Sequence, residues 1–273
     1  MNAGLRMLRH PVPMLLAYPA EAPQSSATFG PYTIGAAHDA PIAPPHPCPL
    51  ILISHGTGSS HLVHRNLALH LARNGYIVLV PEHPRNNRND NSLANTNENL
   101  ADRPRLLSQL IDWALADPTL APHIAPQHIA IVGHSLGGYT ALATAGGRPA
   151  NIDVSSDPRV KALVLLAPAT PWFLPPGSLA DVRVPILMLT AEKDPHTPEG
   201  HGIIVKRGLP PQTPIEHNVI PNAGHFSFLS PFPPAMATPA FAPAHDPPGF
   251  NREHFQHEMF STIDAFLQRA FNR

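Results

Sequence analysis

Residues 133–137 read Gly-His-Ser-Leu-Gly and form the segment with the clearest capacity for chemistry. An apolar run at residues 129–132 precedes them, and a helical pattern continues through residue 145. In a tight Gly-x-Ser-x-Gly turn between a strand and a helix, the serine hydroxyl stands exposed above the sheet, and both glycines must lack side chains. This context predicts Ser135 as a nucleophile, with a purely structural turn as the alternative.

A serine hydroxyl is a poor nucleophile until a nearby base accepts its proton, and a carboxylate orients that base. Where the serine lies in such a turn, the chain order is serine, acid, histidine. His225 meets this demand because it lies in Pro-Asn-Ala-Gly-His-Phe (221–226), directly after an expected strand that ends at Ile220. We predict His225 as the base; the alternative is one more surface histidine among the 18 in the chain.

The acid that orients this histidine is predicted to be Asp194, which follows an expected strand ending at Thr190. From that position its carboxylate can reach over the tip of the strand to the histidine. Asp181 and Glu192 are the competing carboxylates. For each of the three, the alternative is an ordinary solvated turn residue.

A glycine-containing loop, Ser-His-Gly-Thr-Gly-Ser at residues 54–59, follows the first strongly apolar strand and precedes a helix. Such a loop can aim the backbone N–H of Thr57 at the site, where it and the N–H of Leu136 would stabilise the oxyanion of a tetrahedral intermediate. A phosphate-binding loop is the alternative, because glycines before a helix also bind anions. No Gly-Lys-Ser/Thr completes that pattern, so we predict an oxyanion hole, with His55 as a structural residue that fixes the loop.

Two histidine pairs have a spacing that can bind zinc when a third ligand is supplied. They are His61 with His64, and His254 with His257. Neither pair forms a His-Glu-x-x-His pattern, so metal catalysis is not expected. We predict that the reaction needs no metal and no cofactor.

The elements that must position these residues alternate between short apolar runs and helical patterns, which is typical of βα units around a mainly parallel sheet. The expected strands are residues 50–53, 76–80, 129–132, 162–166, 186–189 and 216–220, after an early strand at 13–17. One helix is expected to end at Asn74-Gly75, a second to begin at Pro104, and a last one to cover about residues 253–271. We expect one α/β domain over residues 1–273, with helices on both faces of the sheet and an N-terminal hairpin region at about 10–45.

A large cap over the site is not expected. The segment at residues 168–183, between two predicted strands, is short and contains Pro171, Pro175 and Pro176. Prolines break helices, and isolated helices under roughly 12 residues are marginal. Residues 230–250 look irregular, and residues 85–99 are either one rim of the pocket or a flexible solvated loop.

The site should therefore be partly open to solvent, with apolar side chains at its border. The predicted pocket residues are His134, Trp172, Phe173, Phe226 and Phe228. The aromatic side chains among them would bind an apolar acyl or aryl group of modest size. Filling of the core is the alternative for these four aromatics.

The overall composition excludes several classes of partner. Lys and Arg number 18 and Asp and Glu 19, and no stretch concentrates basic residues, so neither nucleic acid nor an anionic membrane is an expected partner. No apolar run approaches the roughly 20 residues that span a bilayer. The single cysteine, Cys48, permits no intramolecular disulfide. We expect a soluble, cytoplasmic protein that acts on a small molecule, and its oligomeric state stays open.

Beyond these single residues, the chain resembles the bacterial family of predicted dienelactone hydrolases related to platelet-activating-factor acetylhydrolase, within the α/β-hydrolase superfamily. The segments that carry the resemblance are 53–59, 81–84 (Pro-Glu-His-Pro), 103–105 (Arg-Pro-Arg), 133–138, 224–229 and 246–252 (Asp-Pro-Pro-Gly-Phe-Asn-Arg). The resemblance implies the α/β-hydrolase fold, Ser135 and His225 as members of a triad, and carboxylic esters as substrates.

The resemblance leaves the acid and the substrate open. Animal acetylhydrolases of this kind place an aspartate before the penultimate strand, and here that neighbourhood ends at Asp181 without a clear counterpart. True dienelactone hydrolases use a cysteine nucleophile, whereas this chain has Ser135. Their substrate is therefore not carried over. The sequence predicts a serine esterase that forms an acyl-enzyme; an amidase, thioesterase or acyltransferase with the same triad, or a binding protein without turnover, are the alternatives.

Overall fold

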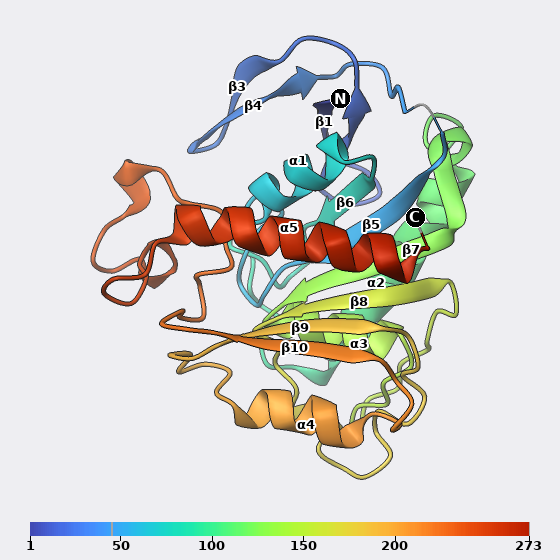
Figure 1. Ribbon diagram of the computed structural model, residues 1–273, viewed down its shortest axis with the longest axis vertical. Helices are drawn as coiled ribbons and strands as arrows, with labels where there is room; N and C mark the ends of the chain where they lie inside the picture. Colours follow the sequence, from blue (N-terminus) through green and yellow to red (C-terminus); the bar gives the residue numbers. More distant parts are fainter. Residues whose placement is uncertain (45, 273) are drawn as a thin grey trace.

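The computed structural model describes residues 1–44 and 46–272, and its strands form one ten-stranded sheet in the order β10-β9-β8-β7-β5-β6-β2-β1-β4-β3 (Figure 1). Six neighbouring strands run parallel. They are β5 (Cys48–Ser54), β6 (Ile77–Pro81), β7 (Ile124–His134), β8 (Val160–Leu166), β9 (Ile186–Ala191) and β10 (Ile215–Ile220). All six lie where strands were predicted. Every residue of β5, β6 and β9 is buried, as expected for strands covered on both faces.

The N-terminal strands extend this sheet beyond β6. β2 (Met14–Ala20) pairs antiparallel with β6, and β1 (Asn2–Leu8) pairs antiparallel with β2. β4 (Tyr32–His38) lies parallel to β1, and β3 (Ser25–Phe29) closes that edge. The early strand predicted at residues 13–17 is therefore present. The hairpin region begins at Asn2 rather than near residue 10, because Ala3 and Leu5 are buried against the sheet.

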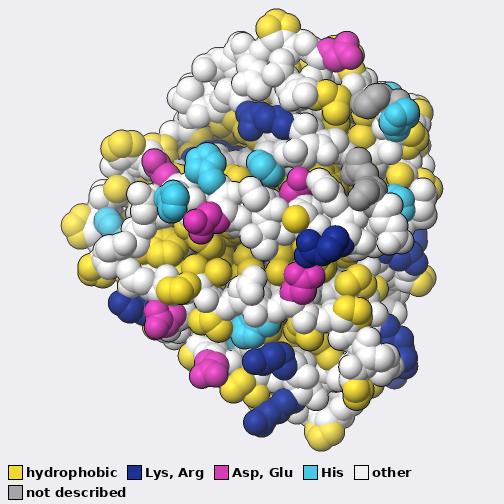
Figure 2. Space-filling view, in the orientation of Figure 1, with side chains coloured by type: hydrophobic (Ala, Val, Ile, Leu, Met, Phe, Trp, Pro, Cys, Tyr) yellow, Lys and Arg dark blue, Asp and Glu magenta, His cyan; other side chains and the backbone are white. Residues whose placement is uncertain are grey.

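Helices cover both faces of the sheet, and a separate hydrophobic core lies beneath each layer. On one face lie α1 (Arg65–Arg73) and α5 (Arg252–Ala270), and α5 crosses the front of the view in Figure 1. On the other face lie α2 (Asn97–Ala116), α3 (Leu136–Thr144) and α4 (Gly200–Gly208). The apolar side chains of α5 are buried, whereas histidine and acidic side chains lie over α5 on the face shown in Figure 2.

The second helix begins earlier than its proline suggested. α2 starts at Asn97, where the Thr96 hydroxyl caps it by accepting a 3.2 Å hydrogen bond from the Asn99 N–H. Pro104 lies inside the helix, so the prediction that it opens the helix was wrong. Proline has no N–H to donate to the carbonyl four residues earlier. The Tyr139 hydroxyl donates to that Leu100 carbonyl instead, at 3.1 Å, which makes the interior proline tolerable and fastens α2 to α3.

Irregular segments occupy the end of the sheet at which the parallel strands finish. Between β8 and β9 the described chain forms only the short 3-10 turn η2 (Pro171–Phe173), so no multi-helix cap is present there. Segment 230–250 contains two further turns, η3 (Pro234–Met236) and η4 (Ala242–Ala244), and leads into α5 (Figure 1). Among the described residues, no helix has both the length and the hydrophobicity needed to cross a bilayer.

Candidate active site

The turn between β7 and α3 places Ser135 in an uncommon backbone conformation. Its φ of 56° and ψ of −119° are strained for a residue with a side chain, and such strain often accompanies function. A side chain on Gly133 would clash with the Gly137 backbone, and one on Gly137 would clash with the Ser54 carbonyl. The Ser135 N–H donates to the Leu166 carbonyl at 3.0 Å, which anchors the turn to β8. Steric crowding therefore explains why both positions require glycine, as the sequence predicted.

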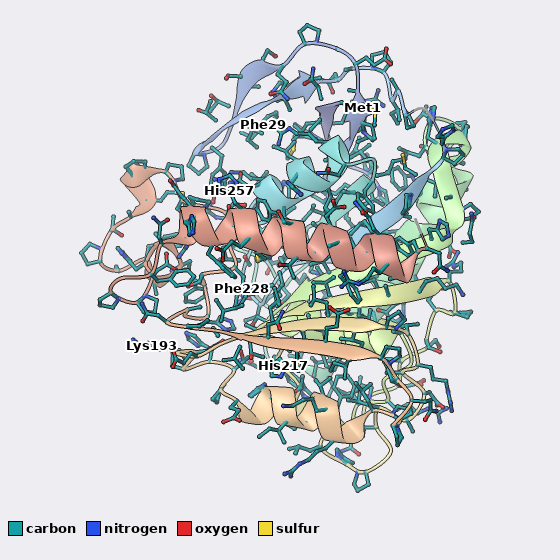
Figure 3. The ribbon with its side chains drawn as sticks, in the orientation of Figure 1. Met1, Phe29, Lys193, His217, Phe228 and His257 are labelled. Carbon is teal, nitrogen blue, oxygen red and sulfur yellow. The ribbon has the colours of Figure 1, made fainter. Side chains whose placement is uncertain are left out.

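The loops after β9 and β10 bring Asp194 and His225 together. Nδ1 of His225 lies 2.7 Å from Oδ2 of Asp194, whose side chain is fully buried. A carboxylate can only accept here, so Nδ1 carries the proton and Nε2 is left free to accept another. Lys193, beside Asp194, marks this end of the sheet in Figure 3.

Asp194 is held as a carboxylate by several donors. Its Oδ1 accepts from the backbone N–H groups of His196 (2.7 Å) and Thr197 (2.9 Å), and its Oδ2 accepts from the Thr197 hydroxyl (2.7 Å). Burial alone would raise the pKa of this group, but the hydrogen bonds and charge of His225 and the bonds from Thr197 outweigh burial and lower the pKa. The charged form is therefore the favoured state in this site.

The two competing carboxylates lie elsewhere. Asp181 is half-exposed and forms a 2.5 Å ion pair with Arg148 on the surface. Glu192 accepts a 2.7 Å hydrogen bond from the Asn222 N–H in an exposed turn. Of the three acids considered from the sequence, Asp194 is the one that contacts His225.

A cavity of about 550 Å³ joins the predicted nucleophile, base and oxyanion loop. Ser135, His225, Thr57, His134 and Phe226 all line it. Leu136 is the first residue of α3, next to Ser135. A side chain built on Gly56 would lie 3.1 Å from Cβ of Ser135, so the predicted oxyanion loop passes directly beside that residue.

Comparison with known proteins agrees with this architecture. The family model for the alpha/beta hydrolase fold matches residues 49–184. In its solved structure, the ferulic acid esterase from Streptomyces cinnamoneus superposes with a TM-score of 0.73 at 19% identity, over 98% of this chain and 88% of that chain. The protein has the α/β-hydrolase fold. It is also 30% identical over 128 residues to the cutinase est1 of Thermobifida alba, which is 46% of this chain and 39% of the cutinase. The match thus spans about two fifths of that curated relative.

In this α/β-hydrolase fold, three of the predicted pocket aromatics lie away from the cavity. Phe173 and Phe228 are buried in the two cores, at 2% and 1% exposure. Phe228 packs under α5 against Phe255, 5.7 Å away between ring centres (Figure 3). Trp172 and Phe173 contact the Tyr139 ring because η2 turns toward α3. The described lining of the cavity contains Phe226 but not these three, so core packing, the alternative considered above, describes them.

Several lining residues had no local signal in the sequence. Tyr32 comes from the N-terminal strand β4, and Phe232, Phe241 and Pro243 come from segment 230–250. Arg88 adds a cationic side chain from the 85–99 loop, which therefore does border the pocket. The rings of Phe232 and Phe241 meet edge to face at 5.1 Å. These segments are distant in the sequence and come together only in the folded chain. The aromatic residues and prolines of segment 230–250 were the one sequence feature that could have indicated its place in the cavity lining.

A second serine–histidine pair lies below the cavity. The Ser54 hydroxyl and Nε2 of His83 are 2.8 Å apart, but the two residues are 0% and 1% exposed. Burial, with the charge of Arg103 and the nearby His55, lowers the pKa of His83 well below its usual value. Neither residue lines the cavity that contains Ser135 and His225, so this pair lies outside the candidate active site.

Three of the four histidines with zinc-like spacing contact other side chains. Nδ1 of His61 lies 2.9 Å from a Glu82 carboxylate oxygen, and Nε2 of His254 lies 3.4 Å from Glu258. His64 packs edge-on against the His134 ring, 5.5 Å between centres. Within the described chain, no group of three or more His, Cys, Asp or Glu residues is arranged to hold a metal ion.

Proposed function

We propose that the protein is a serine hydrolase that cleaves carboxylic esters through an acyl-enzyme intermediate. The observation that carries the proposal is the Asp194–His225 hydrogen bond of 2.7 Å behind a cavity whose lining includes both His225 and Ser135. The cutinase and the ferulic acid esterase that resemble this chain are esterases by name, which supports an ester as the substrate class.

In the proposed reaction, His225 accepts the Ser135 proton as the serine oxygen attacks the ester carbonyl. Asp194 fixes the tautomer of His225 and stabilises the imidazolium that forms. The backbone N–H groups of Thr57 and Leu136 stabilise the oxyanion. His225 then protonates the leaving alcohol and activates water for deacylation, so the cycle needs no cofactor.

The lining of the cavity favours esters with an apolar acyl or aryl group of modest size. Phe226, Phe232, Phe241 and Tyr32 supply aromatic surface on its walls. A volume of about 550 Å³ falls in the range of small-molecule sites. We also propose a closer relation to the bacterial predicted dienelactone hydrolases and the acetylhydrolases, on the sequence segments given above. A small-molecule substrate and a cytoplasmic location remain predictions.

Hydrolysis of a panel of chromogenic esters of increasing acyl length tests the proposal. We expect turnover by the wild type, and a loss on the order of a million-fold in Ser135→Ala, because a triad acts as a unit. Ser261→Ala is the control, since Ser261 is an exposed serine of α5 outside the cavity lining. Substantial activity in a folded Ser135→Ala protein, or a wild type inert toward every ester, would refute the proposal.

A further inference from the structure

Arg103 is a buried cation without an acidic partner. The residue is 1% exposed, and among the described residues it forms no ion pair with a carboxylate. Burial lowers the pKa of Arg103 to about 9, so the group remains charged at neutral pH. Burying an unpaired charge is costly, and apolar replacements of buried ions are often neutral or stabilising. Packing alone therefore gives no reason for an arginine here.

The acceptors of Arg103 lie on the segments that surround the oxyanion loop. Its Nη2 donates to the His55 carbonyl, at the start of that loop. Its Nη1 donates to Oδ1 of Asn86 at 2.6 Å, and its Nε donates to the Thr140 hydroxyl of α3 at 3.0 Å. One rigid guanidinium thus connects the loop after β5, the loop after β6 and the helix that follows Ser135.

The contacts of His55 determine the direction of the Thr57 N–H. The backbone N–H of His83 donates to Nε2 of His55 at 3.1 Å, so the proton of this imidazole must lie on Nδ1. That Nδ1 donates to the Gly56 carbonyl at 2.7 Å. Because a trans peptide is planar, fixing this carbonyl also fixes the N–H of Thr57 on the opposite side of the same peptide.

The side chain of Thr57 is held through a second route. The Asn86 amide is oriented by Arg103, which can only donate to its oxygen. Its Nδ2 is therefore directed at the Thr57 hydroxyl, 2.9 Å away, and at Oδ1 of Asn91, 2.7 Å away. Both routes, through His55 and through Asn86, start at the same guanidinium.

We propose that Arg103 is a positioning residue for the oxyanion hole: it holds the loop so that the Thr57 N–H points at the oxygen that becomes charged in the transition state. This role rests on the proposed serine hydrolase function. It also assigns a role to the first residue of the Arg-Pro-Arg sequence at 103–105, because that arginine donates a hydrogen bond to the oxyanion loop.

A misdirected donor weakens the binding of the transition state more than it weakens the binding of the substrate. Removal of one oxyanion donor typically lowers kcat by about 10² to 10³-fold, and displacement of a donor should cost less. Arg103→Lys keeps the positive charge, but its single ammonium group cannot reach all the acceptors that the planar guanidinium of Arg103 binds. We expect kcat to fall by about tenfold to a hundredfold, with KM changed by less than about threefold.

The test compares Arg103→Lys with Arg105→Lys, a matched control two residues along α2. Arg105 is exposed and pairs with Asp102 on the surface at 2.5 Å, so its variant should keep wild-type kinetics. The second readout is inhibition by an aryl trifluoromethyl ketone. Ser135 adds to its carbonyl, His225 takes the serine proton, and the carbonyl oxygen becomes an oxyanion in the hole. The inhibition constant should rise by about the factor by which kcat/KM falls.

Thr57→Val keeps the proposal testable if Arg103→Lys does not fold. This variant keeps the backbone N–H of Thr57 but removes the hydroxyl that Asn86 holds. We expect a smaller fall in kcat, about threefold to tenfold. In the double variant the two effects should be less than multiplicative, because both act through one loop.

Unchanged kcat and ketone affinity in folded Arg103→Lys would overturn the proposal, as would a rise in KM alone. A lower Tm with unaltered kinetics would give Arg103 a purely structural role and overturn it too. If Arg103→Lys cannot be folded, unchanged kcat in Thr57→Val has the same consequence. A wild type that neither hydrolyses esters nor reacts at Ser135 would refute the proposed function as well, so the two failures are distinguishable.

Discussion

The two sides of the cavity are built in different ways. Ser135, His225 and Thr57 lie on loops at the ends of β7, β10 and β5, where buried hydrogen bonds and glycines without room for side chains fix the backbone. Another part of the lining consists of Tyr32 and of aromatic residues from segment 230–250. That segment has little regular structure.

Hydrogen bonds attach segment 230–250 to the rest of the fold near its two ends. Arg65 donates to the Pro231 carbonyl and its guanidinium lies 4.3 Å from the centre of the Tyr32 ring. Asp246 accepts from the Ser227 hydroxyl (2.6 Å) and from Nε of Arg252 (2.9 Å), which ties the far end of the segment to the His225 loop and to α5. The geometry of the proposed triad is therefore fixed by the sheet, whereas the shape of the cavity depends on a segment that is held mainly near its two ends.

A substitution in the loops at the strand ends should have the largest effect on catalysis. Asp194→Asn keeps the shape of the residue but would favour the wrong tautomer of His225, so we expect kcat to fall by roughly 10⁴-fold. Asp181→Asn, at a surface ion pair, should leave kcat unchanged. Steady-state kinetics of the two variants provide the check. A large fall in Asp181→Asn with an active Asp194→Asn would move the acid to the other position.

A phenylalanine of the core and one of the cavity lining should respond differently. Phe228 is buried in the core, so Phe228→Ala should lower the free energy of unfolding by about 3–5 kcal/mol and leave the KM of the folded fraction unchanged.

Phe232 lies in the cavity wall and is only partly buried, so its variant should behave in the opposite way. Phe232→Ala should raise KM for an aryl ester by roughly threefold to tenfold, the value of one aromatic contact, with little change in Tm. Denaturant unfolding and KM measurements on both variants test the contrast. A fall in stability for both with unchanged KM would mean that the second wall does not contact substrate.

The smallest effect concerns acid stability. Asp194 has a pKa below its usual value of 3.8 in the folded protein, so its contribution to stability is present above that pH and is lost as the pH falls further. Between pH 4 and 2, the free energy of unfolding should fall more steeply for the wild type than for Asp194→Asn. Urea titrations at several pH values measure both slopes, and parallel slopes would show that the carboxylate gains nothing from its partners.

The contrast between the loops at the strand ends and segment 230–250 also explains which features the sequence could predict. Five of the six parallel strands contain a continuous apolar run, and Ser135, Asp194 and His225 each follow a predicted strand, at the end of the sheet where its loops gather. The acid stayed open among three residues because the sequence does not show which carboxylate reaches the histidine. In the structure, Asp194 is the carboxylate of the three that lies within hydrogen-bond distance of His225.

The features that could not be predicted depend on contacts between distant segments. Tyr32 and Phe241 are more than half the chain apart in sequence, yet they line one cavity. The start of α2 was misplaced because Pro104 is tolerated only where the Tyr139 hydroxyl replaces its missing bond. Trp172 and Phe173 turn toward that same tyrosine rather than toward the site. In each case a tertiary partner overrides the local pattern.

Covalent labelling tests the central claim most directly, because only an activated serine reacts with an organofluorophosphonate. The protein is incubated with the reagent, digested and mapped by mass spectrometry. The account predicts one phosphonylated residue, Ser135, and a much slower reaction in Asp194→Asn. Labelling at another residue, or no labelling of a folded wild type, would contradict it.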